Sequence, residues 1–290
     1  MKRGISGFAF FLFLLPSLGA FEWPVEQRIL IATFGEYRWD DFLPGIDIGG
    51  GRQEVRPSEK GEIIYIHEEK SGLAFLPSGL GNYLVLEHER GLRTLYAHLE
   101  ADSLLYENVQ VEPQNIIGRV GSSGMSQGLY LHFQVLDREM NQLVNPLLIL
   151  PPLRDMTRPV LEQVWLQKNR TRTPLAEQST MASGTYNLLL SVYDPSGNGH
   201  YTRFMNPHKI QVFINGEQLS SISFESLRYE EGSMFLVQSE NVTSQLLYTS
   251  DGLLNMGTFQ LTVGDSIVEI IVEDFSRNRV TKDFRIRVTG

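Results

Sequence analysis

Short apolar runs separated by glycine, proline and serine recur from residue 21 to the C-terminus, and none of them shows a sustained helical period. Runs such as "RILIATF", "EIIYI", "NYLVLEHE" and "LRTLYAHL" are typical of short β-strands. Because strands must pair and bury at least one face, this pattern predicts a mainly β protein.

A proline-rich interruption divides the 290 residues into two predicted domains. The runs quoted above lie in the first domain, which we place over residues 21–150. Pro151 and Pro152 disfavour regular structure and predict a stiff linker over residues 151–159. Residues 160–290 contain short alternating strands with polar turns, which predicts an Ig-like β-sandwich.

Residues 1–20 have the layout of a secretory signal peptide. Lys2 and Arg3 precede a short apolar run, and the segment ends in the small residues Gly19 and Ala20. The run is shorter than the roughly 20 apolar residues that a membrane-spanning helix needs. We therefore expect export to the periplasm, the cell envelope or the extracellular space, with no integral membrane span after cleavage.

The composition excludes several kinds of partner and metal site. The formal net charge is −9, and an acidic exported protein is a poor candidate for binding nucleic acid or anionic lipid. No cysteine is present, which excludes disulfides and thiolate metal ligands. Any metal must therefore be held by histidine, aspartate or glutamate.

Three strand-like segments carry residues that can hold a metal or move a proton. Alternate residues of a strand share a face, so the apolar residues of "GLYLHFQV" predict that Tyr130 and His132 point away from the core. The same alternation in "TLYAHL" predicts that Tyr96 and His98 face a groove. In "LPGIDIGG", Asp47 stands between two isoleucines and is also predicted to point away from the core.

Two pieces of the second domain, "VYDPSGNGHYTRF" and "VEDFSRNRVTKDF", echo each other. Each has Asp, Ser and Asn at alternate positions, beginning at Asp194 and Asp274. Such a spacing is compatible with a calcium loop or with a hairpin turn. The remaining oxygen ligands of a calcium site are missing, so the pattern favours hairpin turns.

The order of the motifs in the first domain resembles the lysostaphin-type (LytM-domain) zinc peptidases. The resemblance runs from about residue 21 to residue 146 and rests on "FGEYR", "GIDIGG", "GNYLVLEH", "TLYAHL" and "IIGRVGSSGMSQGLYLHFQV". Members of this family hydrolyse peptide cross-links in bacterial cell walls. The resemblance implies an antiparallel LytM-type β domain, and it does not cover the C-terminal domain.

The resemblance also implies the residues of a zinc site. Members of the family bind zinc through the His and Asp of H-x-x-x-D and the second His of H-x-H, which leaves one position for a water that the metal acidifies. The first His of H-x-H and a His from Y-x-H-L handle protons and stabilise the oxyanion.

Carried over to this sequence, the family pattern is incomplete. Asp47 and His132 match two metal ligands, and His98 matches one catalytic histidine. Leu43 stands where the third ligand is expected, and Tyr130 replaces the other catalytic histidine. Leucine has no lone pair to donate, and tyrosine, with an ordinary pKa of about 10, is a poor proton shuttle. We therefore expect a degenerate site with a vestigial His98, too few zinc ligands and no cofactor.

This expectation favours an exported, catalytically inactive LytM-type protein that binds peptidoglycan or regulates a cell-wall hydrolase. Its groove, made more apolar by Leu43, Tyr96 and Tyr130, is expected to serve as a docking surface. One alternative is an active zinc endopeptidase in which Asp41 replaces the missing ligand. The other is a structural or adhesive envelope protein that acts through the C-terminal sandwich.

Overall fold

The computed structural model describes residues 21–69, 78–104, 109–195 and 205–290, and most of their regular structure is β-strand. The prediction of a mainly β fold is confirmed. Within these ranges, no helix is long and apolar enough to cross a membrane. The predicted signal peptide, residues 1–20, lies outside the described residues.

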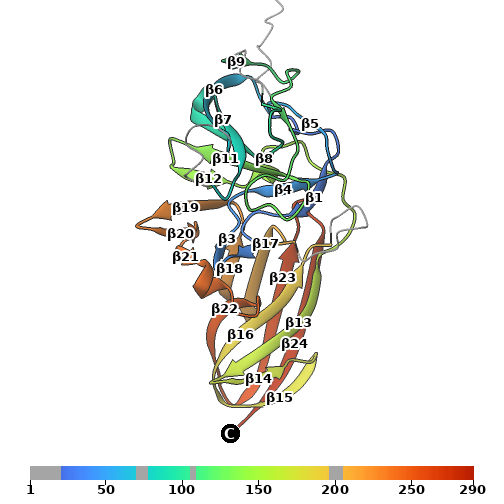
Figure 1. The fold of residues 1–290 in the computed structure, drawn as a ribbon. Helices are drawn as coiled ribbons and strands as arrows, with labels where there is room; N and C mark the ends of the chain where they lie inside the picture. Colours follow the sequence, from blue (N-terminus) through green and yellow to red (C-terminus); the bar gives the residue numbers. More distant parts are fainter. Residues whose placement is uncertain (1–20, 70–77, 105–108, 196–204) are drawn as a thin grey trace, which may run out of the picture.

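A long antiparallel sheet dominates the upper half of the molecule in Figure 1. Its strands follow the order β21, β20, β19, β12, β11, β8, β7, β6 and β9, and β4 pairs with both β11 and β1. The strand bounds are β1 Ile29–Ala32, β4 Ile46–Gly49, β6 Gly61–His67, β7 Asn82–His88, β8 Leu92–Leu99, β9 Gln110–Val111, β11 Leu131–Asp137, β12 Gln142–Val144, β19 Ser226–Glu230, β20 Ser233–Leu236 and β21 Val242–Thr243.

Two small strand pairs flank this sheet. A hairpin joins β2 (Tyr37–Arg38) to β3 (Asp41–Phe42), and β5 (Glu54–Val55) pairs with β10 (Gly118–Arg119). A 3-10 turn, η1, separates β7 from β8 at Glu89–Gly91.

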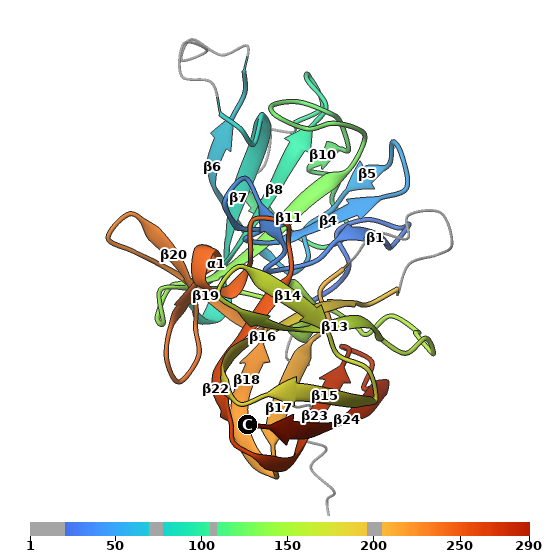
Figure 2. The ribbon, with the colours of Figure 1, turned by 90° about the horizontal axis from the view of Figure 1, so that it is seen from below.

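The lower half of the molecule is a β-sandwich, seen along its length in Figure 1 and from below in Figure 2. One sheet has the order β14, β13, β16, β22, and the other has the order β15, β24, β23, β17, β18. The pairing is antiparallel except between β15 and β24. The bounds are β13 Val160–Lys168, β14 Thr171–Pro174, β15 Gln178–Ala182, β16 Gly184–Tyr193, β17 Lys209–Ile214, β18 Glu217–Ser223, β22 Leu254–Leu261, β23 Gly264–Glu273 and β24 Arg279–Thr289.

The two halves are not separate along the chain. Strands β19 to β21 and the short helix α1 (Ser244–Leu247) follow the sandwich strand β18, yet β19 extends the upper sheet by pairing with β12. Leu143 lies opposite Leu227, and the Asn145 side-chain amide donates to the Phe224 carbonyl oxygen at 2.8 Å. Within the range predicted as an Ig-like β-sandwich, residues 160–290, strands β19 to β21 therefore belong to the upper sheet and not to the sandwich.

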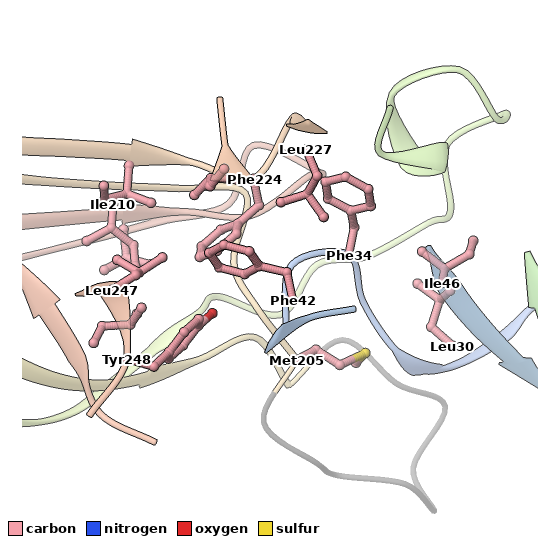
Figure 3. Close-up of a cluster of buried hydrophobic side chains, with 14 of the residues drawn as sticks. Leu30, Phe34, Phe42, Ile46, Met205, Ile210, Phe224, Leu227, Leu247 and Tyr248 are labelled. Carbon is pink, nitrogen blue, oxygen red and sulfur yellow. The ribbon is translucent and has the colours of Figure 1, made fainter. Parts of the chain in front are cut away.

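A continuous hydrophobic core crosses the junction (Figure 3). Phe34 and Phe42 come from the first half, and Phe224 and Leu227 come from the second; each is at most 3% exposed. Gly35 lies between them with φ +78°, and an added Cβ would come within 2.5 Å of the Phe224 ring. This position requires glycine for two independent reasons: the positive φ and the close approach of a ring.

The C-terminal half also holds the backbone next to Gly35 by hydrogen bonds. The buried Tyr248 hydroxyl donates to the Gly35 carbonyl oxygen at 3.0 Å and accepts from the Asn206 side-chain amide at 2.9 Å. The Asn206 backbone N–H donates to Thr33 Oγ1 at 2.8 Å. The turn over residues 33–38 is thus fixed from the side of the sandwich.

Candidate functional site

Asp47 on β4 and His132 on β11 lie directly opposite each other in the antiparallel pair. Directly opposed residues share a face, so their side chains meet away from the core. Their sequence neighbours Ile46, Ile48 and Phe133 are fully buried on the other face. Asp47 is 2% exposed and His132 is 4% exposed, so the pair is shielded from water.

The His132 ring is fully engaged by two neighbours. Its Nδ1 lies 2.7 Å from Asp47 Oδ1, and its Nε2 lies 2.9 Å from the Gln134 amide nitrogen. A carboxylate only accepts, so Nδ1 carries the proton and Nε2 accepts from the Gln134 amide. A metal needs an unprotonated ring nitrogen with a free lone pair, and this arrangement leaves none on His132.

Arg38 on β2 occupies the second oxygen of Asp47. Its Nη1 donates to Asp47 Oδ2 at 2.8 Å, and its Nη2 lies 3.6 Å from Glu36 Oε2. Burial alone would raise the pKa of Asp47. The hydrogen bond from His132, together with the charge of Arg38, outweighs this effect and holds that pKa below its ordinary value. Asp47 therefore stays ionised with a guanidinium as its counter-charge.

His98 joins the same face because the backbone departs from regular alternation. His98 has φ +61°, and the register between β7 and β8 shifts between the Leu84–Tyr96 and Asn82–Leu99 pairs, which marks a β-bulge. The His98 Nδ1 donates to the Ser123 carbonyl oxygen at 2.9 Å. Burial, the largest effect, lowers the pKa of His98, so the ring is held neutral.

Tyr130 immediately precedes β11 and completes the group of aromatic rings. Its ring centre lies 5.0 Å from that of His98 in an edge-to-face arrangement, and His98 lies 6.0 Å from His132. Burial raises the pKa of Tyr130 above its ordinary value, so the phenol keeps its proton at neutral pH. The structure therefore brings His98, Tyr130, His132 and Asp47 together.

The expectation that Tyr96 lines the groove is wrong. Tyr96 is 0% exposed, lies opposite Phe133 and packs on that ring at 5.2 Å in the core. Its hydroxyl accepts from the Ser58 backbone N–H at 2.8 Å. The prediction assumed strict alternation from residue 95 to 99, whereas the bulge at His98 inserts one residue and puts Tyr96 and His98 on opposite faces.

The residues at the positions that the family resemblance assigns to zinc ligands do not fit zinc. Leu43 is buried and offers no donor atom. Asp41, the proposed substitute, turns its Oδ1 to the N–H of Phe42 at 2.8 Å. Among the described residues, no group of three potential ligands gathers around Asp47. Two ligand residues with engaged donor atoms fall short of the three protein ligands of a catalytic zinc site.

Arg38 and Glu36 belong to the candidate site, and the sequence alone did not single them out. Both lie in the "FGEYR" motif, which entered only as part of the family resemblance. The only sequence signal for these two residues is a basic residue two positions after an acidic one. This spacing predicts a contact with Asp47 only once the fold is known to bring β2 beside β4. Gln134, by contrast, follows from alternation with His132 on β11.

A separate acidic group lies near the junction, outside this site. Carboxylate oxygens of Asp155, Asp194 and Asp274 lie within 4.8 Å of one another. Asp274 accepts from the Asn278 backbone N–H at 2.8 Å, which closes the hairpin between β23 and β24. The second motif therefore forms the hairpin turn between these strands; most of the first, residues 196–204, lies outside the described residues.

Comparison with known proteins identifies the family of the domain that contains Asp47 and His132. Residues 41–146 match the family model described as Peptidase family M23. This part of the chain is an M23 domain of the LytM type. A second family model matches residues 158–289 and names no function.

Individual relatives share the M23 region. The DD-carboxypeptidase/endopeptidase Mpg of Neisseria meningitidis is 37% identical over 98 residues, which cover 34% of this chain and 22% of Mpg. The cell division protein DipM of Caulobacter vibrioides is 29% identical over 138 residues, which cover 46% of this chain and 21% of DipM. The catalytic domain of lysostaphin from Staphylococcus simulans is 25% identical with a TM-score of 0.30, covering 36% of this chain and 76% of that domain.

Proposed function

We propose that this protein is a catalytically inactive M23-type protein, exported to the bacterial envelope, that binds or regulates at the cell wall. The membership of residues 41–146 in peptidase family M23 supports the wall association, as do relatives named as a DD-carboxypeptidase/endopeptidase and a cell division protein. The partner is peptidoglycan itself or a separate wall hydrolase.

The proposed inactivity rests on one observation. Every oxygen or nitrogen atom with which Asp47 and His132 could bind a metal is already hydrogen-bonded to another protein group. Metal-assisted hydrolysis needs three protein ligands and an open position for an acidified water. Here Arg38 and His132 take both oxygens of Asp47, and Gln134 takes the remaining nitrogen of His132. The guanidinium supplies the positive charge that a metal would otherwise bring to this carboxylate.

The proton-handling position is also unsuited to the family reaction. Tyr130 stands beside His98, and its raised pKa keeps the hydroxyl protonated. A protonated phenol donates a hydrogen bond but does not exchange a proton readily near neutral pH. Loss of the ligand set and of the shuttle at one site supports a binding role for the groove.

The surface beside the site has the character of a binding surface. Met125 is 67% exposed and Leu129 is 41% exposed, and both lie in the segment that leads into Tyr130. Exposed apolar side chains in the segment next to buried polar groups suit peptide contacts. The acidic composition argues against nucleic acid as the partner.

The test uses the full chain, because the two halves share a hydrophobic core and the β12–β19 pairing. Either half alone would expose apolar residues and an unpaired strand edge. Purified protein is expected to hold far less than one equivalent of zinc, to sediment with isolated peptidoglycan or stimulate a wall amidase, and to release no peptidoglycan fragments. A Met125→Ser/Leu129→Ser variant should lose binding, whereas Val263→Ser, at an equally exposed site in the sandwich, should retain it. One equivalent of tightly bound zinc together with peptidoglycan cleavage abolished by Asp47→Ala would overturn the proposal.

A further inference from the structure

The two-residue tip of the β2–β3 hairpin displays a tryptophan in a strained conformation. Arg38 pairs with Asp41 across the hairpin, and the loop residues Trp39 and Asp40 have φ +54° and +63°. Two consecutive positive φ angles are the requirement of a type I′ turn, where asparagine, aspartate and glycine are preferred. Asp40 suits this turn, and Trp39 does not.

Burial of the Trp39 side chain does not offset the strain of this backbone conformation. Its side chain is 77% exposed, against 7% for Trp23. A bulky residue held at positive φ and left in solvent is an outlier of the kind found at functional sites. The fold alone would be served better by asparagine or glycine at this position.

The tip is held rigidly from both sides. On the side of the M23 site, Arg38 is bound to Asp47. On the side of the C-terminal half, Ser244 Oγ and Gln245 Nε2 of α1 donate to the Asp40 carbonyl oxygen at 3.0 and 2.5 Å. The Tyr37 hydroxyl donates to Asp40 Oδ1 at 2.8 Å. A hairpin backbone held in this way needs little further ordering on binding.

The charges around Trp39 indicate what it contacts. Asp40 and Asp41 follow it directly, and neither forms an ion pair among the residues that the structure describes. The nearest cation, Arg38, is turned towards Asp47 and Glu36. An exposed indole face beside two uncompensated carboxylates attracts an ammonium or guanidinium group.

We propose that the Trp39 tip is a docking point for a lysine- or arginine-rich segment of a partner protein. A basic side chain would lie over the indole ring while Asp40 and Asp41 supply the opposing charge. The inference stands apart from the proposed wall association, because the hairpin tip itself makes the contact; Asp47 enters only through its ion pair with Arg38. It identifies a second contact surface, on the face that both halves of the molecule hold in place.

The test measures binding of a capped hexalysine peptide to the full chain by calorimetry at low and physiological salt. Trp39→Gly should weaken binding about tenfold, and Trp39→Tyr should retain most of it. Asp40→Asn, which keeps the turn and the acceptor for Tyr37, should weaken binding and reduce its salt dependence. Asp283→Asn, at an exposed acidic position in the sandwich that forms no ion pair among the described residues, is the matched charge control and should have little effect.

Thermal unfolding of the same variants separates docking from folding. Trp39→Gly should unfold at the same temperature as the unchanged protein or higher, because glycine suits the left-handed turn. The proposal is overturned if hexalysine binds Trp39→Gly as well as the unchanged protein, or if that variant is less stable. It is also overturned if neutral chitohexaose binds through Trp39 and hexalysine does not, since that outcome identifies a glycan surface.

Discussion

His132 donates from Nδ1 to Asp47 at 2.7 Å across two paired strands, so the two residues that match the family's ligand positions bind each other. Arg38 closes the group at 2.8 Å from the other oxygen of the carboxylate. A site that elsewhere requires a metal to satisfy its carboxylate is here satisfied by protein hydrogen bonds. This network gives the buried charge of Asp47 a partner within the protein.

Removal of Arg38 should destabilise the fold. Arg38→Met leaves Asp47 buried with only His132 as its partner, and we expect a loss of about 1–3 kcal/mol in the free energy of unfolding. Arg52→Met, which breaks the exposed pair with Glu100, should cost at most about 1 kcal/mol. Urea unfolding measures both.

A double-mutant cycle tests whether Arg38 acts through Asp47. Asp47→Asn removes the charge that Arg38 balances, so the Arg38→Met/Asp47→Asn variant should lose less stability than the two single changes added together. Additive losses would show that Arg38 stabilises the turn independently of Asp47.

Zinc binding should appear only when the missing ligand is supplied and the competing cation, Arg38, is removed. Leu43→His combined with Arg38→Met is expected to bind about one equivalent of zinc after dialysis, measured by metal analysis. Each single variant should bind much less. Adding Tyr130→His is expected to restore some peptidoglycan hydrolysis; zinc binding by Leu43→His alone would contradict the role given to Arg38.

Glu36 makes stability depend on pH near neutrality. Burial raises its pKa to about 7 from an ordinary 4.5, against the hydrogen bonds from Thr33 and the charge of Arg38. Between these two pH values the folded state keeps a proton that the unfolded state has lost, so stability is highest below about pH 4.5 and falls as pH rises through 7. The fall attributable to Glu36 is on the order of 2–3 kcal/mol.

Glu36→Gln is the matched variant for this pH dependence. Glutamine still accepts from the Thr33 N–H and hydroxyl, as Glu36 Oε1 does at 2.5 and 2.9 Å, but it does not titrate. The slope of unfolding free energy against pH between 4.5 and 7 should flatten in this variant. An unchanged slope would assign the pH dependence to another group.

The junction provides a paired test of close packing. Gly35 and Gly51 both have φ +78°, but an added Cβ meets the Phe224 ring only at Gly35 and meets nothing within 4 Å at Gly51. Gly51→Ala should cost about 1 kcal/mol from the backbone alone. Gly35→Ala should cost about 1–3 kcal/mol more, and Phe224→Leu in the Gly35→Ala background should recover part of that difference. Equal losses at the two glycines would mean that the junction relaxes freely.

The alternation of apolar and polar residues along single strands predicted correctly which side chains of β11 are buried and which face the candidate site. Leu131, Phe133 and Val135 are fully buried, as "GLYLHFQV" predicts, and His132 lies on the opposite face. The same reasoning failed at Tyr96 because a bulge is a tertiary feature: the left-handed His98 is stabilised by contacts with Ser123 that the local sequence does not encode.

The network around Asp47 could be predicted only in part. The absence of a ligand at Leu43 is visible in the sequence, since leucine offers no donor whatever the fold. The ion pair between Arg38 and Asp47 could not be predicted from the sequence, because it depends on the hairpin of β2 and β3. It also depends on Tyr248, which lies more than two hundred residues away and holds the turn next to Arg38. Local propensity contains no information about such a distant contact.

The pairing of β12 with β19 also sets an order of events during synthesis. β12 ends at Val144, and its partner strand begins only at Ser226, after most of the sandwich sequence has been made. At typical rates of elongation this interval lasts on the order of several seconds, during which the edge of β12 has no native partner. An unpaired edge can pair with other chains. Assembly of the upper sheet is therefore completed late in translation, and during this delay the edge of β12 is open to pairing with other chains.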